Sequence, residues 1–342
     1  MLLPCASFWK NAEPKTNPDM ALRISNTHDE WHYYGHGKLL ITAEYFVLDG
    51  ALALAVPTRY GQHLRVKALS AHDGLLYWVA LNHQGKPWLQ LVIDTENLQC
   101  INTESDIAER LVNILRKARE LNPLFLINGR NHAVETALEF PNEWGLGSSS
   151  TLIHCLAQWA GVDGYTLLRE TIGGSGYDVA CAAHHAPILY QLVDGAPIVR
   201  QITWQPPFCD QLYFVYLGKK KLSSEAIRYY REQGSPDTDT LQHLSSLTLK
   251  ISWAQSLDEF EELINEHENF IAGHLNMPKV KDVHFNDHTG SVKSLGAWGG
   301  DFVLLTARQE PAHIKEYLKN KGFDTVWSWK ELILPFSTTK NN

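Results

Sequence analysis

Apolar and β-branched positions in the first part of the chain predict a set of antiparallel strands. Residues 30–48 are rich in aromatic and aliphatic side chains, and the turn pair Asp49-Gly50 separates them from the apolar run 51–56. Further strands are expected at residues 62–68, 74–81, 88–94 and 133–139, and helical spacing of apolar residues predicts a helix over 101–121. This order of elements indicates an α+β domain rather than a doubly wound sheet.

The second half of the chain predicts a smaller domain in which helices pack on a sheet. Before this smaller domain begins, the first domain is expected to contain a helix over residues 151–160 that ends near Gly161 and a hairpin around Asp194-Gly195. Pro206-Pro207 marks a domain boundary, beyond which strands are expected at 211–217, 302–306 and 325–329 and helices at 257–275 and 312–321. We therefore expect a flexible extension over 1–29, with Met20 a possible true start, and domains over 30–205 and 206–342.

Composition narrows the class of protein. The 342 residues carry a formal charge of -8 and are 44% hydrophobic, which is ordinary for a globular protein and argues against nucleic-acid or membrane-surface binding. No apolar run is long enough for a membrane span. The five cysteines are scattered without a CxxC pair, which favours free thiols in a cytoplasmic protein. The pair His184-His185 is interpreted as surface or packing histidines rather than metal ligands.

A loop rich in glycine and serine leads into the helix over 151–160. It reads Trp144-Gly145-Leu146-Gly147-Ser148-Ser149-Ser150. Free backbone N–H groups and the positive end of the helix dipole favour phosphate at such a helix start. Two alternatives remain beside the phosphate site. The serines could act only as helix caps, or the glycines could open a dinucleotide fingerprint, which fits poorly because Ser150 stands where a third glycine is needed.

Two other glycine-rich stretches carry candidate chemistry. Asp178 follows the turn Gly173-Gly-Ser-Gly176 and begins a helix of small residues, and residues 288–301 contain a second cluster of glycines. By itself Asp178 is equally consistent with a first-turn helix acid, and Lys38, in the predicted strand, with a solvated edge residue. The occurrence of these glycine-rich stretches and charged residues together in one chain identifies a class of protein much more specifically than any one of them does.

These motifs, taken together, resemble those of the GHMP kinase superfamily over about residues 30–335. Gly37-Lys-Leu-Leu-Ile-Thr-Ala-Glu44-Tyr-Phe-Val-Leu-Asp-Gly50 is similar to the first family motif, and Gly145-Leu-Gly-Ser-Ser149 to the phosphate-binding second. Gly174-Ser-Gly-Tyr-Asp178-Val-Ala is similar to the segment with the catalytic aspartate, and Ser294-Leu-Gly-Ala-Trp-Gly-Gly-Asp301 to the third motif. The resemblance implies a two-domain fold, with a ribosomal protein S5 domain 2-like first domain and a ferredoxin-like second domain.

The resemblance also implies the roles of individual residues. Asp178 would accept or orient the proton of the attacking hydroxyl, and Lys38 would neutralise charge. ATP phosphates would lie over residues 144–150, with Ser149 and Glu170 as ligands of Mg²⁺. Substrate contacts are expected from Glu44, Lys293, Gly296, Gly299 and Gly300, with Lys219, Lys220, Lys221 and Ser223 as further phosphate-binding candidates.

The nearest resemblance within the superfamily is to phosphomevalonate kinases and to a bacterial subgroup named for its Gly-Tyr-Asp-Ile-Ala signature. The implied substrate is therefore mevalonate or 5-phosphomevalonate, with the phosphorylated form slightly favoured, bound by a monomer or homodimer. Ala43 stands where the family usually has glycine, and Trp298 interrupts a usual glycine cluster; both would narrow the pocket. A catalytically silent nucleotide-binding homologue, a sugar kinase of the same fold and a diphosphomevalonate decarboxylase remain alternatives.

Overall fold

The computed structural model describes residues 29–218 and 223–335. Apart from Asp29, the expected extension lies outside these residues, as do the candidate phosphate ligands Lys219–Lys221. The chain forms two compact units that alternate along the sequence. The first runs to Gly35 and also contains Gly61–Pro141 and Ser148–Gly173; the second contains His36–Tyr60, Asn142–Gly147 and the chain from Gly174 on. Each unit is made of several segments that are separate in the sequence. The predicted domain boundary between residues 205 and 206 therefore stays a prediction.

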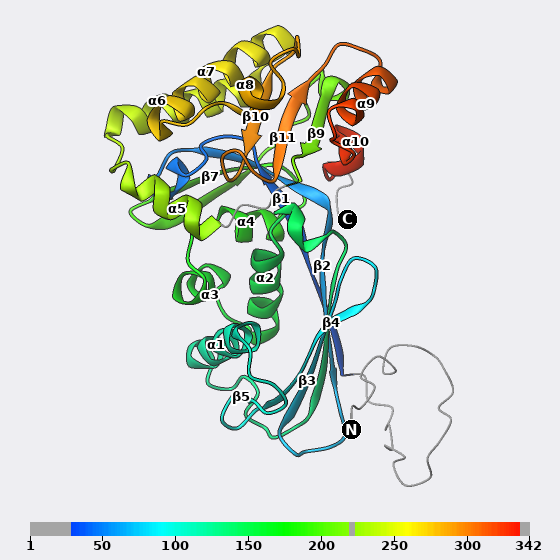
Figure 1. Ribbon diagram of the computed structural model, residues 1–342. Coiled ribbons are helices and arrows are strands. Elements are labelled where there is room, and N and C mark those ends of the chain that lie inside the picture. The colour runs from blue at the N-terminus through cyan, green and yellow to red at the C-terminus, as the bar shows by residue number, and fades with distance from the viewer. Residues whose placement is uncertain (1–28, 219–222, 336–342) are drawn as a thin grey trace, which may run out of the picture. The chain divides into compact units, whose positions relative to one another are not determined.

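The first unit is built on a mixed sheet. Its strands are β3 (Leu75–Leu81), β4 (Pro87–Asp94), β5 (Gln99–Cys100), β6 (His132–Leu138) and parts of β1 (Glu30–Leu40) and β2 (Ala53–Ala68). Strand β6 pairs parallel with β3 and antiparallel with the second half of β2, where Val66 lies opposite Val134. Strand β4 pairs antiparallel with both β3 and β5. Helices α1 (Asp106–Leu121), α2 (Ser148–Ala160) and α3 (Gly164–Thr171) lie on one side of these strands (Figure 1).

The second unit contains the first half of β2, which pairs with β7 (Ile188–Val193), and β7 forms a hairpin with β8 (Ala196–Gln201). The turn at Asp194-Gly195 confirms the predicted hairpin, and both residues have positive φ, as a tight two-residue turn requires. Helix α4 (Tyr177–Ala183) precedes β7. A second sheet has the order β10 (Val292–Leu295), β11 (Phe302–Thr306), β9 (Leu212–Tyr216) and β12 (Val326–Ser328), all antiparallel.

Helices flank the second sheet. Helices α6 (Thr238–Trp253), α7 (Leu257–Leu275) and α8 (Val280–His284) form a group beside β10, and α9 (Pro311–Asn320) and α10 (Trp329–Leu332) follow β11 and β12 (Figure 1). Helix α5 (Ser223–Glu232) joins β9 to α6. Helix α7 has the predicted bounds, because the Ser256 side chain caps its start and Asn276, in the left-handed conformation, ends it. No helix in the described ranges combines the length and apolarity needed to cross a membrane.

Four sequence expectations about these elements were wrong. The strand expected over 30–48 stops at Leu40, and residues Phe46–Asp49 form a short 3₁₀ helix, since Ala43 and Tyr45 have positive φ and interrupt the extended chain. Gly50 therefore ends this 3₁₀ helix rather than turning a hairpin. Helix α1 begins at Asp106 instead of residue 101, because the Ser105 hydroxyl accepts the Ala108 N–H. Helix α2 includes the serines expected to precede it.

The central strand of the second sheet generates a stability prediction. Leu305 on β11 is fully buried in an apolar cluster with Ile314 and Leu318 of α9. Leu305→Ala should lower the free energy of unfolding by about 2–5 kcal/mol, because a cavity replaces the lost methyl groups. Urea unfolding measures this, with Leu124→Ala, whose side chain is 77% exposed, as the control expected to change stability by less than about 0.5 kcal/mol. Equal effects of the two substitutions would contradict the assigned core.

Candidate active site

Lys38 lies near the end of β1 and contacts the glycine-rich loop of residues 142–147. Its Nζ donates a hydrogen bond of 3.0 Å to the Gly145 carbonyl, and its backbone N–H donates one of 2.9 Å to the Leu146 carbonyl. Both bonds lie within the second unit. The first motif and the start of the second, far apart in sequence, are therefore joined by side-chain and main-chain contacts.

The amine of Lys38 is surrounded by groups that favour its charged form. Burial alone lowers the pKa of Lys38, but the Tyr177 phenol and the carboxylates of Asp178 and Asp301 outweigh burial and raise it. The Lys38 Nζ also lies 5.6 Å from the centre of the Tyr177 ring, a cation–π distance. Burial raises the pKa of Tyr177, so this phenol stays neutral. The site therefore holds one ammonium group beside two carboxylates.

Asp178 lies in the first turn of α4, where the sequence predicted it. Gly176 caps this helix with φ of 91°, a left-handed conformation that glycine adopts without strain. The Asp178 side chain is partly exposed, and its Oδ1 accepts the Val179 N–H at 3.0 Å. The glycine turn therefore starts the helix at the position that brings Asp178 into electrostatic contact with Lys38.

Asp301 ends the third glycine-rich segment and was not among the predicted site residues. A Cβ built on Gly145 would overlap the Asp301 carboxylate, so this carboxylate packs directly on the Gly145 backbone. Asp301 has φ of 49°, and its carbonyl accepts the Leu217 N–H at 2.8 Å. Its place at the end of the third motif was the signal that could have identified it.

Trp144, predicted to contact ATP, packs in an aromatic cluster of the second unit. Its ring centre lies 5.9 Å from that of Phe302 and 5.7 Å from that of Trp327, both in edge-on geometry. The Tyr216 hydroxyl donates to the Glu143 carbonyl at 3.0 Å. These contacts fix the start of the glycine loop on the second sheet of the same unit.

Ser148–Ser150 and Glu170 belong to the first unit. Ser149 is exposed in the first turn of α2, whereas Ser150 is buried. Glu170 lies near the end of α3, where its carboxylate is 3.9 Å from the Lys117 Nζ and 3.7 Å from the Arg169 Nε. Among the described residues no group of three or more His, Cys, Asp or Glu side chains is arranged to hold a metal ion. The assignment of Ser149 and Glu170 to Mg²⁺ stays a prediction.

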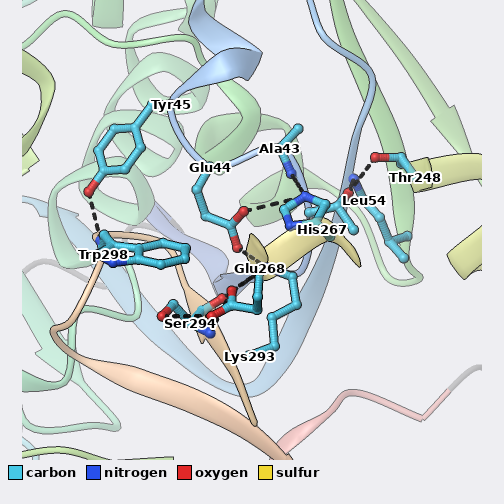
Figure 2. Close-up of polar contacts among 11 residues, drawn as sticks. Ala43, Glu44, Tyr45, Leu54, Thr248, His267, Glu268, Lys293, Ser294 and Trp298 are labelled. Carbon is cyan, nitrogen blue, oxygen red and sulfur yellow. Dashed lines mark hydrogen bonds and ion pairs between the residues drawn. The ribbon is translucent and has the colours of Figure 1, made fainter. Parts of the chain in front are cut away.

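Glu44 and Lys293, both expected to contact substrate, instead contact each other in a fully buried ion pair with an Oε1–Nζ distance of 2.5 Å (Figure 2). Glu268 of α7 is the second carboxylate beside this amine, at 3.4 Å, and it accepts the Ser294 N–H at 3.1 Å. Burial is the main cause that raises the pKa of Glu44 and raises that of Glu268 to about 8. Since neither Glu44 nor Lys293 has exposed surface, this arrangement gives no support to direct substrate contact by them.

His267 lies beside this cluster as a neutral side chain. Its Nε2 accepts the Ala43 N–H at 3.0 Å, and burial lowers its pKa well below the ordinary value (Figure 2). The 3.6 Å approach to the Glu44 Oε2 is therefore no ion pair, because Nε2 carries no proton to donate. His267 and Glu268 occupy the same face of α7 as Phe260, Ile264 and Ile271. Polar residues within that apolar stripe were the signal that sequence reasoning missed.

The remaining predicted glycines lie in the third segment. Gly296 and Gly299 have φ of 69° and 70°, and an added Cβ would meet no atom within 4 Å at either. Between them, Trp298 is buried, its N–H donating to the Tyr45 hydroxyl at 2.7 Å and its Nε1 to the Pro278 carbonyl at 3.0 Å. The indole therefore fastens this segment to the body of the second unit.

The fold is similar to those of several solved small-molecule kinases. Methanococcus jannaschii mevalonate kinase is 14% identical with a TM-score of 0.66, over 90% of this chain and 99% of that one. Streptococcus pneumoniae phosphomevalonate kinase in complex with phosphomevalonate and AMPPNP is 16% identical, with a TM-score of 0.64 over 87% of this chain and 99% of that one. Lactococcus lactis galactokinase complexed with galactose is 12% identical, with a TM-score of 0.68 over 90% and 94%.

No protein-family model matches the chain, and no curated protein matches its sequence. The structural matches nevertheless extend over nearly the whole chain. The chain therefore has the two-domain GHMP kinase fold of class α+β, as its motifs predicted. The four cysteines in the described ranges are free thiols, as expected.

The contact between Gly145 and Asp301 predicts a difference between two glycine substitutions. Gly296→Ala should lower the free energy of unfolding only through the backbone strain of a positive φ, by roughly 1–2 kcal/mol. In Gly145→Ala, where φ is 68°, the new methyl group must also displace the Asp301 carboxylate. This substitution should therefore lower the free energy of unfolding by about 1–3 kcal/mol more than Gly296→Ala does. Chemical denaturation measures both, and Asp301→Gly should recover the excess in the Gly145→Ala background. Equal costs at the two glycines would contradict the packing of Asp301 on Gly145.

Glu268 predicts a pH dependence of stability. The pKa of Glu268 in the folded protein, about 8, lies above the ordinary value of 4.5. The contribution of its neutral carboxyl group to the free energy of unfolding is therefore fully present below pH 4.5 and is lost as the pH rises through 8. Glu268→Gln, which mimics the neutral carboxyl, should therefore gain stability relative to wild type across this window, by up to roughly 1.4 kcal/mol per pH unit.

Urea unfolding of the two proteins between the two pKa values measures this difference. Glu262→Gln, on an exposed position of the same helix, is the matched control and should follow wild type at every pH. A stability difference between Glu268→Gln and wild type that does not change with pH would show that Glu268 is ionised in the folded protein.

Proposed function

We propose that this chain is an ATP-dependent phosphotransferase of the GHMP kinase type, acting on mevalonate or 5-phosphomevalonate. The observation that carries the proposal is the set of charges around Lys38: its amine donates to the Gly145 carbonyl, Asp178 and Asp301 act on that amine, and the Asp301 carboxylate packs on Gly145. An ammonium group fixed beside carboxylates at a glycine-rich loop is suited to stabilising a transferred phosphoryl group. The fold, shared with kinases of small molecules, supports the same conclusion.

We propose that the glycine loop binds the phosphates of a nucleoside triphosphate. Gly145 and Gly147 have positive φ, and the chain then enters the first turn of a 13-residue helix, whose free N–H groups favour phosphate oxygens. The exposed hydroxyl of Ser149 is a suitable oxygen ligand for Mg²⁺, and we retain Glu170 as the proposed second ligand. Bound Mg²⁺ would neutralise phosphate charge.

Asp178 and Lys38 then have separate tasks. For a hydroxyl acceptor, Asp178 accepts the proton as the oxygen of the acceptor bonds to the γ-phosphorus and the bond to ADP breaks. Lys38 stabilises the negative charge that spreads over the transferred group. A phosphate acceptor is largely ionised at neutral pH, so there Asp178 orients the acceptor and Lys38 contributes most of the stabilisation.

The proposal also concerns which small molecule accepts the phosphoryl group. Resemblance of the motifs favours 5-phosphomevalonate or mevalonate, and two of the similar structures are kinases of these compounds. Similarity to a galactokinase is equally strong, so hexoses are tested alongside them. We retain cytoplasmic location and a monomer or homodimer as predictions.

Asp178→Asn tests the proposal directly. ADP release with Mg-ATP is measured for mevalonate, 5-phosphomevalonate, 5-diphosphomevalonate, homoserine and hexoses. One mevalonate species should support turnover, and Asp178→Asn should lower its kcat by about 10²–10⁴ because proton transfer or orientation is lost. Asp194→Asn, in the exposed β7–β8 turn, is the matched control and should keep wild-type kcat.

Each other outcome identifies an alternative. Turnover on hexoses alone would indicate a sugar kinase, and release of CO₂ from 5-diphosphomevalonate a decarboxylase. ATP binding without turnover on any acceptor would indicate a catalytically silent homologue. Full activity of Asp178→Asn would remove Asp178 from its proposed role.

A further inference from the structure

Tyr45, in the loop that follows β1, has a backbone conformation that is costly for a residue with a side chain. Its φ of 63° and ψ of -45° are close to those of the rare γ-turn with positive φ, and the Phe46 N–H closes this turn on the Glu44 carbonyl at 2.8 Å. Such strain persists only where the surrounding structure holds it, and it is concentrated at functional sites. The Tyr45 side chain is therefore expected to have a task in the second unit.

The Tyr45 phenol is aimed at the third glycine-rich segment, residues 294–301. Its oxygen accepts the backbone N–H of Trp298 at 2.7 Å (Figure 2). Its ring stacks on Tyr230 of α5, with ring centres 5.5 Å apart and planes 19° from parallel. Tyr230 is fully buried, and its hydroxyl donates to the Asp49 carboxylate at 2.6 Å. The direction of the phenol is thus fixed by the strained turn at one end and by a buried ring along its face.

The part of the segment that receives this contact has little other restraint. Residues 296–301 join β10 to β11 and lie beyond the ladder of these two strands, which ends at the pair Leu295 and Phe302. Gly296 and Gly299 have positive φ, and a Cβ added to either would meet no atom within 4 Å. Glycines in open space can adopt many backbone conformations. The strand ladder therefore does not fix the course of this loop.

Trp298, between these two glycines, is held by two contacts of different kinds. Its indole is buried, and the indole Nε1 donates to the Pro278 carbonyl at 3.0 Å. This contact fixes where the ring lies, but the main chain can still rotate about the bonds that join the ring to it. The bond to Tyr45 is made by the backbone N–H itself, so it fixes the peptide plane. Together the two contacts set the place and the direction of the main chain in the middle of the loop.

The direction of this loop decides where the Asp301 carboxylate lies. Two glycines separate Asp301 from Trp298, and the Asp301 carbonyl accepts the Leu217 N–H at 2.8 Å. Its carboxylate packs on Gly145 and acts on the Lys38 ammonium. Because two glycines transmit little stiffness, the loop keeps this carboxylate in place only while both its middle and its end are attached.

We propose that Tyr45 is a positioning residue of the phosphoryl-transfer site, whose hydroxyl holds Trp298 and with it the loop that presents Asp301 to the site. The strained turn gives the phenol the direction that this contact needs. Without the hydroxyl, the Trp298 N–H loses its acceptor, the loop turns, and the negative charge beside Lys38 is displaced. The consequence for catalysis rests on the proposed function, whereas the attachment of the loop does not.

Hydrogen exchange tests the attachment without any substrate. Tyr45→Phe removes the hydroxyl alone and keeps the ring that stacks on Tyr230. Amide exchange of residues 296–301 should be about tenfold faster in this variant than in wild type, the factor expected when one hydrogen bond of ordinary strength is lost. Equal exchange of these residues in the two proteins would overturn the proposal.

Tyr229→Phe is the matched control for this substitution. The Tyr229 hydroxyl likewise makes one bond to a main-chain group, the Leu275 carbonyl at 3.0 Å. Both variants should lose similar stability in urea unfolding, because each loses one hydroxyl and one hydrogen bond. Exchange of residues 296–301 in Tyr229→Phe should equal that of wild type. Faster exchange there in both variants would show a general loss of stability and would overturn the specific role of Tyr45.

Kinetics on the acceptor that supports turnover test the consequence for catalysis. Tyr45→Phe should lower kcat by about 10–100-fold, the effect of misplacing a charged group in a site by about 1 Å. The KM of the acceptor should change by less than about twofold, since the phenol acts on the loop and not on the substrate. Tyr229→Phe should keep wild-type kcat. A raised acceptor KM with unchanged exchange would overturn the proposal in favour of direct contact between the phenol and the substrate.

A double-mutant cycle with Asp301→Asn shows whether Tyr45 acts through Asp301. In the Asp301→Asn background, Tyr45→Phe should lower kcat by less than about twofold further, because the group that it positions has already been changed. Effects of the two substitutions that multiply would overturn the action through Asp301. Absence of turnover on every acceptor would overturn the proposed function, while the exchange comparison still decides how the loop is held.

Discussion

The buried ion pair between Glu44 and Lys293 is the constraint on which the second unit depends. It joins the loop after β1 to β10 with no exposed surface on either side chain. Breaking one partner of such a pair leaves an uncompensated charge in the interior, which is far more costly than the pair is favourable. Because α7 adds Glu268 to the same amine, three segments distant in sequence are fixed at one point.

The third glycine-rich segment connects this ion pair to the candidate site. Lys293 and Ser294 begin the third glycine-rich segment, and Asp301 at its end packs on Gly145 beside Lys38. The site is thus assembled from three motifs, each positioned by a different part of the second unit. The proposed phosphoryl transfer needs little covalent participation by the protein, because such a reaction is promoted mainly by positioning and by charge stabilisation.

The sequence predicted the elements and motifs but not the partners of the buried polar groups. Periodicity gave α7 and β11 with their observed bounds, and glycine turns identified the environment of Asp178. The positive φ of Ala43 and Tyr45, which ends β1 early, arises from tertiary contacts that local preference does not encode. Lys293 resembled a substrate ligand for the same reason: a lysine in a motif does not reveal that a carboxylate on another element neutralises it.

The measurement that tests the central claim most directly is ³¹P NMR of Mg-ATP and the accepted mevalonate species, with wild type and Lys38→Met. The account predicts that wild type forms a new phosphate ester or diphosphate resonance in equal amount to ADP, and that Lys38→Met forms neither at a comparable rate. ADP accompanied only by inorganic phosphate, or equal product formation by both proteins, would contradict phosphoryl transfer at the Lys38 site.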